Sequence, residues 1–215
     1  MTFGREPSNP PHDMNQADAK VKPVYFIHRR SMAIVMGFKR TSEIITVSGS
    51  YENDTDGFTV DQVDLQLNPL DQEVFVVVGV LADWTGPAPE PLGSIPAGAL
   101  FNLTQLVAFT TTRPSAQLGL ASPNCFATAR RQCIAQIVSG PDVSTYTLVE
   151  QNNTELPDAE IPYLAIIATS DFFVSGTDDV SNLSNMAIEY KIYGYRAKAD
   201  AATYAALVQS EVLSS

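Results

Sequence analysis

The sequence predicts an all-β protein, an antiparallel β-sandwich of about eight strands followed by one short C-terminal helix. Three observations lead to this fold class. Hydrophobic residues make up 45% of the 215 residues, which is enough for a sizeable core. Short β-prone segments recur at intervals of roughly 10 to 20 residues, between loops rich in Pro and Gly. Helical patterns do not alternate with these segments, which argues against a parallel α/β sheet.

Residues 1–23 are expected to form an N-terminal arm outside the core. They contain four prolines and only scattered apolar side chains, a composition typical of a linker or an arm. The first 20 residues lack an apolar segment, so we expect no secretory signal. No stretch of the chain approaches the roughly 18 consecutive apolar residues of a membrane span, so none is expected.

The sandwich is expected over residues 24–198, and its first segments are short. Apolar runs at 25–27 and 32–36 flank a pair of arginines. Over residues 45–51, apolar and polar side chains alternate at period two, which predicts a strand with one buried face. The sequence Asn-Asp-Thr-Asp-Gly at 53–57 predicts a turn.

The middle of the chain predicts a bulged strand, a central strand and a stiff loop. Apolar residues alternate over 58–60 and then on the opposite parity over 63–67, and a β-bulge at Gln62 would account for the change of face. Residues 74–82 are apolar on both parities, which predicts a central strand buried on both faces. Pro and Gly then recur from 86 to 98, which predicts a rigid loop.

The second half of the sandwich continues this pattern. Further strands are predicted at 103–112, at 125–138, around 146–150, at 161–168 and at 188–193. A loop is expected at 175–179, Ser-Gly-Thr-Asp-Asp, because these residue types favour turns.

Only residues 199–215 are expected to contain a helix, packed on the sandwich. Asp200 can cap a helix that begins at Ala201. An apolar stripe at helical spacing then follows and is expected to face the sheets. Its members are Tyr204, Leu207, Val208 and Val212.

Eight strands in two four-stranded sheets form a jelly roll, an architecture found in viral coats, lectins and cupins. A cupin metal site needs about three imidazoles and a carboxylate, and the chain has only two histidines, His12 and His28. No Ser-His-Asp nucleophile motif and no phosphate-binding loop occurs. We therefore expect no enzymatic activity, no cofactor and no metal. A pair of carboxylates brought together by the fold is the one catalytic arrangement left open.

Two local features receive a structural interpretation. The only cysteines, Cys125 and Cys133, are expected to be buried free thiols. On one strand they would lie roughly 26 Å apart, too far to bridge, whereas a turn between them would permit a disulfide. The acidic turn at 52–57 matches half of a calcium loop, but Val63 occupies the position of its final Glu. Calcium bound there in another geometry stays open.

Charge is distributed unevenly along the chain. The net charge is −11, from 13 basic and 24 acidic residues, which disfavours a general nucleic-acid binder. Residues 1–40 nevertheless carry seven basic and three acidic side chains. The basic segment, residues 20–40, contains no acid and six bases: Lys20, Lys22, Arg29, Arg30, Lys39 and Arg40. It predicts contact with nucleic acid or with the acidic body of a neighbouring copy; a solvated face is the alternative.

Taken together, the chain resembles the single jelly-roll coat proteins of small icosahedral viruses, including those that infect bacteria or archaea. The resemblance is carried by the Pro-rich arm, the basic segment and the eight or so strands between Ile44 and Arg196. The chain departs from many such coats because residues 1–19 carry only one basic side chain, Arg5, instead of dense basic runs. This departure argues against genome binding by the arm itself.

The resemblance implies a structural protein of the virion, not an enzyme, that self-assembles into an icosahedral capsid. Its partners would be many copies of itself, with other virion proteins and genome nucleic acid as further partners. The six basic residues are expected to face the particle interior or an acidic neighbour. Two alternatives stay open: a decoration, spike or tail component of a larger phage, and a lectin-like glycan-binding module. The aromatic residues available to stack on sugars are Trp84, Tyr51, Tyr146, Tyr193 and Tyr195.

Overall fold

The structure is a computed structural model that describes residues 37–54, 57–86, 100–137, 144–151, 154–157, 162–178 and 186–213. The chain divides into two units, residues 1–33 and 34–215, and every described residue belongs to the second unit. The predicted arm and the strands expected at 25–27 and 32–36 therefore lie outside the described residues.

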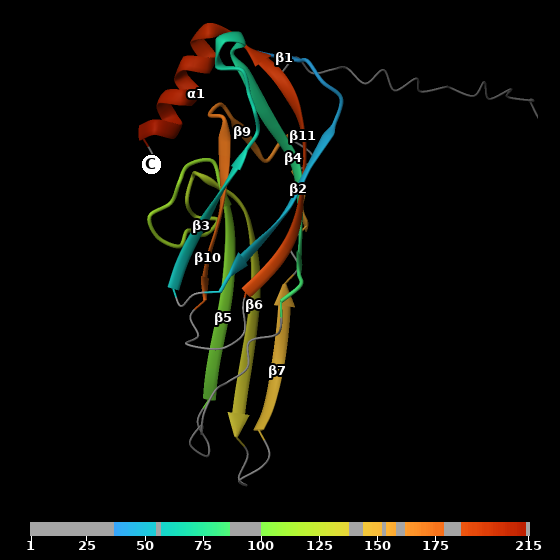
Figure 1. Cartoon of the computed structure of the whole chain (residues 1–215), viewed down its shortest axis with the longest axis vertical. Helices are drawn as coiled ribbons and strands as arrows, with labels where there is room; N and C mark the ends of the chain where they lie inside the picture. The colour runs from blue at the N-terminus through green and yellow to red at the C-terminus, as the bar shows by residue number, and fades with distance from the viewer. Residues whose placement is uncertain are drawn as a thin grey trace, which may run out of the picture. The chain divides into compact units, whose positions relative to one another are not determined.

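The described residues form two antiparallel sheets and one helix (Figure 1). In the first sheet, β1 (Phe38–Arg40) and β2 (Ile45–Asn53) pair with β11 (Met186–Ala199), β11 pairs with β4 (Glu73–Trp84), and β4 pairs with β8 (Thr154–Glu155) and β9 (Ala165–Ile167). In the second sheet, the order is β3 (Gly57–Asp64), β10 (Asp171–Asp178), β5 (Leu100–Thr110), β6 (Cys125–Ile137) and β7 (Ser144–Gln151). The helix α1 (Ala201–Leu213) ends the described chain.

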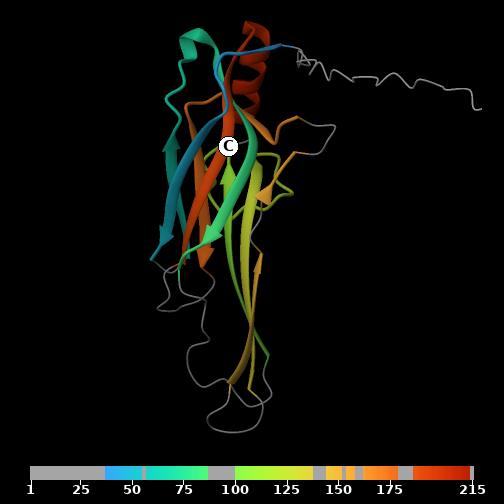
Figure 2. The ribbon, with the colours of Figure 1, turned by 90° about the vertical axis from the view of Figure 1, so that its right-hand side faces the viewer.

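The connectivity of these sheets is that of a jelly roll, which confirms the predicted fold class. Successive strands β2, β3, β4 and β5 alternate between the two sheets, and the last two strands, β10 and β11, return to pair beside the first ones. The described part contains eleven strands instead of about eight, because β1 and β8 are short additions to the first sheet and β10 lies where no strand was predicted. The turned view of Figure 2 shows α1 beside the first sheet.

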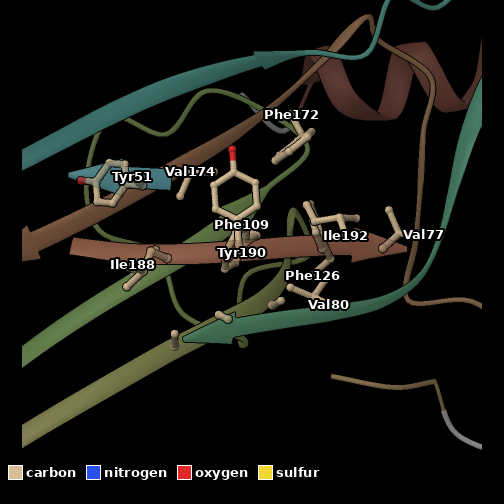
Figure 3. Packing of buried hydrophobic residues seen from close by; sticks show 14 of the residues in the cluster. Tyr51, Val77, Val80, Phe109, Phe126, Phe172, Val174, Ile188, Tyr190 and Ile192 are labelled. Carbon is tan, nitrogen blue, oxygen red and sulfur yellow. The ribbon is translucent and has the colours of Figure 1, made fainter. Parts of the chain in front are cut away.

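The core between the sheets is built from side chains at period two. Ile45, Val47 and Tyr51 of β2 face it, as predicted from their alternation with polar residues. Its centre is aromatic: the Tyr190 ring meets the Phe109 ring edge-on at 5.4 Å and the Phe172 ring edge-on at 6.3 Å between centroids. Figure 3 shows these rings converging from both sheets.

The predicted central strand is confirmed, and it contains a bulge. Phe75 and Val77 of β4 belong to the core between the sheets, whereas Val74 and Val76 belong to a second apolar cluster on the outer face. The register between β4 and β11 then shifts, because Gly194 pairs with Val77 while Tyr193 pairs with Gly79. Past this bulge the even-numbered residues of β4 face the core.

Two expectations about β-structure were wrong. The bulge predicted at Gln62 is absent, because β3 pairs with β10 in one continuous register from Gly57 to Asp64. Phe58 and Val60 are therefore half-buried on the outer face, and the Thr59 hydroxyl lies 2.6 Å from the Tyr51 hydroxyl in the interior.

The loop predicted at 175–179 is instead part of β10, at least through Asp178. Its Ser-Gly-Thr sequence is typical of turns, but Gly176 serves close packing here. A Cβ at this position would overlap the Met186 methyl group and come within 2.9 Å of the Tyr51 ring.

The C-terminal helix forms as predicted, from Ala201, and Asp200 caps it. The Asp200 carboxylate accepts hydrogen bonds from the Thr203 N–H at 2.9 Å and the Thr203 hydroxyl at 2.8 Å. The hydrogen bond from the Thr203 N–H is the main reason that the pKa of Asp200 lies below its ordinary value. Tyr204, Leu207 and Val208 pack on the outer face of the first sheet.

In its last turn, the helix contacts the sandwich through Glu211 and not through the predicted Val212. Val212 is 62% exposed, whereas Glu211 is 6% exposed. The Glu211 carboxylate accepts the backbone N–H groups of Ala168 and Thr169, each at 3.0 Å. Burial raises the pKa of Glu211 above its ordinary value, and these hydrogen bonds oppose the rise only in part.

A buried arginine joins the end of β4 to the second sheet. Arg131 on β6 is 1% exposed. Its Nε and Nη2 donate to the Gln105 Oε1 at 3.1 and 2.8 Å, and its Nη1 donates to the Gly86 carbonyl at 3.0 Å. Its Cζ also lies 4.7 Å from the centre of the Trp84 ring, a cation–π contact.

Replacing Arg131 with Ala is expected to lower the free energy of unfolding by about 3 kcal/mol or more, because the Gln105 and Gly86 oxygens lose buried donors and a cavity opens. Urea denaturation measures this change. Arg130→Ala, at the adjacent exposed position, is the control and is expected to change stability by no more than about 0.5 kcal/mol. Equal losses in the two variants would contradict the assigned role of Arg131.

Glu211→Gln tests the buried carboxylate of α1. Because the pKa of Glu211 is raised in the folded state, the folded protein binds this proton more tightly, and stability falls as the pH rises above the ordinary value of 4.5. Gln does not titrate, so the variant does not lose stability in this way. The difference in unfolding free energy, variant minus wild type, should therefore increase from acidic to neutral pH. Urea denaturation at a series of pH values measures this difference, and a pH-independent difference would count against the interpretation.

Candidate functional site

A groove lies on the outer face of the first sheet and has a volume of about 510 Å³. We name it the outer groove. It is lined by residues of three adjacent strands: Ser48, Gly49 and Ser50 of β2, Glu189, Tyr190 and Lys191 of β11, and Leu81 and Asp83 of β4. It is a shallow depression in a sheet face, and such a surface suits contact with an extended chain better than it encloses a small molecule.

The strand register places two acids side by side in the outer groove. Glu189 pairs with Ser50 on one side and with Asp83 on the other. Lys191 pairs in the same way with Ser48 and Leu81. All six of these residues are exposed. The lining of the groove therefore carries two acids and one base.

The bulge in β4 separates the outer groove from the part of this face that α1 covers. On the helix side of the bulge, Val74, Val76 and Ala197 are buried beneath α1. On the other side, Leu81 is 39% exposed. Leu156, beyond β8, is 68% exposed and lies against Gly79 beside the groove. The outer face is therefore apolar and covered at one end, and mixed and open at the other.

The basic segment enters the described body at β1. Arg40 is held by its own chain: its Nη2 lies 3.1 Å from the Glu43 carboxylate, its Nε donates to the Ser42 carbonyl at 2.6 Å, and its Cζ lies 4.8 Å from the centre of the Tyr195 ring. Lys39 is exposed and pairs in register with Lys198 of β11. The junction therefore presents two lysines side by side.

Gly37 fixes the point at which the N-terminal residues join the body. Its φ is +102°, a region that side chains disfavour. A Cβ there would come within 2.9 Å of the Thr203 hydroxyl and 3.0 Å of the Asp200 carboxylate, and the Asp200 N–H donates to the Gly37 carbonyl at 3.1 Å. The root of the basic segment is thus packed against the capped end of α1.

Of the six predicted site residues, the structure places two, Lys39 and Arg40. The other four, Lys20, Lys22, Arg29 and Arg30, lie outside the described residues. Sequence reasoning did not predict the outer groove, whose acids Asp83 and Glu189 are more than 100 positions apart in the chain. Only the register of β4 on β11 brings them together, and the alternation of Glu189 and Lys191 with apolar residues along β11 was the available signal.

The described residues contain no cluster of metal-ligating side chains. Within them, no group of three His, Cys, Asp or Glu side chains is placed to hold a metal ion. The acidic turn at 52–57 is described only in part, so calcium there stays a prediction. Cys125 and Cys133 are both buried free thiols, as predicted. Burial raises the pKa of Cys125 to about 11, which suppresses the reactive thiolate.

The aromatic residues considered for sugar stacking have other roles in the structure. Tyr51 is 1% exposed in the core, and burial raises its pKa to about 12. The Trp84 ring faces Arg131, and the Tyr195 ring faces Arg40. The Tyr146 side chain lies outside the described part. Tyr193 lies beside Gly79 and is half-buried, as Trp84 and Tyr195 are.

The single helix in the described part of the chain is too short to cross a lipid bilayer.

No protein-family model matches the sequence, and no curated protein matches it. Solved structures with a similar fold include three of polyomavirus VP1. Merkel cell polyomavirus VP1 in complex with GD1a oligosaccharide has a TM-score of 0.38 and 11% identity, over 77% of this chain and 100% of that chain. The unassembled pentamer of Merkel cell polyomavirus VP1 has a TM-score of 0.37 and 10% identity, over 75% and 99%. VP1 of the trichodysplasia spinulosa-associated polyomavirus has a TM-score of 0.35 and 8% identity, over 75% and 98%.

Proposed function

We propose that this chain is a viral coat subunit, many copies of which assemble into a closed icosahedral shell. The observation that carries the proposal is a jelly-roll sandwich whose first strand is preceded by a basic segment, in a chain that is otherwise strongly acidic. A rigid sandwich provides repeated lateral contacts, and closed symmetry multiplies contacts that are individually weak. The virion is then its location.

The other common uses of a jelly roll have less support. Residues 37–213 contain no histidine, so the sandwich lacks the imidazoles of a cupin metal site. Three of the five aromatic rings considered for glycan binding have other contacts: Tyr51 lies in the core, and Trp84 and Tyr195 face arginines. A structural role without enzymatic activity fits this distribution of side chains best.

The basic segment is proposed to make the contacts between subunits. It carries six positive charges without an acid, whereas residues 41–215 carry 21 acids and six bases. Opposite charges on the segment and on the body attract one copy to another without requiring nucleic acid. Contact with the genome, contact with other virion proteins, and a bacterial or archaeal host remain predictions from the sequence.

The direct test of the proposal is the assembly state of the purified full chain. Light scattering and negative-stain electron microscopy are expected to find closed particles of uniform diameter above a threshold protein concentration. Copy number per particle separates a shell-forming subunit from a decoration, spike or tail component. If the purified full chain is a monomer at every protein concentration and ionic strength, the proposal is wrong.

Assembly is expected to weaken as salt is raised from roughly 0.15 M to 1 M, because the Debye length falls from about 8 to about 3 Å. Arg29→Glu/Arg30→Glu should raise the threshold concentration for assembly at low salt. Arg113→Glu/Arg130→Glu, at exposed positions of the body, is the control with the same change in charge. Light scattering against protein concentration gives the thresholds, and equal thresholds for wild type and both variants would exclude the basic segment from assembly.

A further inference from the structure

We infer that the solvent-facing side of α1 is a contact surface for α1 of a second copy of this chain, with the two helices packed antiparallel about a two-fold axis. The inference rests on the proposed function and adds to it one contact surface between subunits. It is carried by the composition of this side of α1, by the exposure of its large apolar side chains and by the way in which the surface complements itself.

α1 is apolar on two opposite sides. Its inner side packs on the first sheet through Tyr204, Leu207 and Val208, and its one charged residue, Glu211, is buried. The opposite side, which we name the outer helix face, carries no charged side chain. It consists of six exposed residues at helical spacing: Ala202, Ala205, Ala206, Gln209, Val212 and Leu213.

This composition is unusual for a helix face in contact with water. The exposed side of a surface helix normally carries charged and polar residues, whereas a helix that is apolar all round is normally buried. In Figure 1, no other described element lies on the outer side of α1. The composition of α1 therefore fits a helix that the sandwich covers on one side and a partner covers on the other.

Large apolar side chains are exposed at both ends of α1. Val212 and Leu213, in its last turn, are 62% and 76% exposed, and Leu70, in the turn before β4, is 93% exposed. That turn lies at the start of α1, because the Gln72 carbonyl accepts the Ala199 N–H at 3.0 Å. Exposed side chains of this size around an apolar helix face are typical of a surface that a partner covers.

An antiparallel pair of outer helix faces places large side chains opposite small ones. The first half of the face holds Ala202, Ala205 and Ala206, whereas the second half ends in Val212 and Leu213. When the second helix runs in the opposite direction, the large side chains of each helix lie over the alanines of the other. The alanines allow the two helix axes to approach closely. The same arrangement brings the partner's last turn to the end of α1 at which Leu70 lies.

The charge of the chain favours a second copy of α1 as the occupant. The net charge of −11 makes two copies repel each other, but the outer helix face brings no like charges together when two copies meet there. The face also offers a charged partner no opposite charge, so a neutral apolar helix matches it better. In an antiparallel pair the two helix dipoles point in opposite directions, which adds a small attraction.

The size of this contact fits a repeated contact in a shell better than an isolated dimer. α1 has 13 residues and is about 20 Å long. Its outer face offers six side chains, whereas a stable interface uses roughly 20 to 30 residues of each partner. The helix pair alone is therefore expected to dissociate at low protein concentration. A two-fold contact that recurs throughout a closed assembly stabilises it even when each contact is weak.

Charge substitutions on the outer helix face of the full chain test the inference. The acidic variant is Ala206→Glu/Gln209→Glu, and the basic variant is Ala206→Lys/Gln209→Lys. Each alone is expected to raise the threshold concentration for assembly by about tenfold or more, because position 206 of one helix faces position 209 of the other and like charges then meet. In an equimolar mixture opposite charges meet, so the two variants together should assemble near the wild-type threshold.

The control variant is Ser115→Glu/Ala116→Glu, which makes the same change in charge as the acidic variant at two exposed positions of the 111–124 loop. It should assemble like wild type. Ala, Gln, Glu and Lys are all good helix formers, so α1 is expected to form in each variant. The urea midpoint of each variant is compared with that of wild type, which distinguishes loss of folding from loss of contact.

Cysteine cross-linking gives a second readout, which does not require assembly into shells. In a mixture of the Ala202→Cys and Leu213→Cys variants, mild oxidation should link the two chains, because these positions adjoin in the antiparallel pair. Ala202→Cys alone should not cross-link, since its two copies would lie about 16 Å apart. The native Cys125 and Cys133 are 8% and 0% exposed and leave the background low. Ala116→Cys mixed with Leu213→Cys is the control and should give no linked pair.

The outcomes separate this inference from the proposed function. If the acidic variant assembles like wild type, the outer helix face is not a contact between subunits. If each charged variant fails and their mixture fails too, the face meets another part of the chain or a different protein, and the second-copy inference is overturned. Cross-linking of Ala202→Cys to itself would overturn the antiparallel arrangement. If wild type never forms shells, the proposed function fails, whereas a specific 202–213 cross-link would still establish the helix pair.

Discussion

The bulge in β4 is the constraint on which the rest of the structure depends. β4 and β11 form the long central pairing of the first sheet, and both strands must bury side chains on the core face along their whole length. On the α1 side of the bulge they must also bury the opposite face beneath the helix. The register shift between Tyr193 and Gly194 lets one pair of strands meet these two demands.

The same constraint divides the outer face into two regions with different chemistry. The fully buried strand residues on the helix side, Val74, Val76, Ala197 and Ala199, are small or branched and apolar, because α1 excludes water from them. Past the bulge the outward positions carry Leu81, Asp83, Glu189 and Lys191, a mixture that no element of the described chain covers. The groove is thus a consequence of where the helix ends and of where the strands change face.

Much of the fold can be predicted from the sequence because helix caps and the alternation of apolar residues agree with the side chains that the folded protein buries. α1 begins where the Asp200 cap predicts, and β2 buries the parity that its alternation indicates. The misplaced bulge has a physical cause. Residues 74–82 are apolar on both parities, so the sequence gives no sign of the bulge that β4 contains there. In β3, Phe58 and Val60 suggest a bulge only because they are apolar residues that lie half-buried on the outer face.

Tertiary contacts decide the features that the sequence does not reveal. The sequence around Gly176 is typical of a turn, but in the structure Tyr51 and Met186 occupy the space that a side chain at this position would need. Glu211 is buried beside the predicted apolar stripe because the backbone N–H groups of Ala168 and Thr169, just after β9, need an acceptor. The groove acids come together only through strand register, which a single sequence does not specify.

The glycine at the root of the N-terminal residues has a consequence for symmetry. Because Gly37 is wedged against Asp200 and Thr203, the chain enters the body at the same place and with the same heading in every copy. Subunits in unlike surroundings of one shell would thus share an identical anchor. If the residues before Gly37 make different contacts in different copies, that difference must therefore arise before Gly37, because the sandwich is the same in every copy.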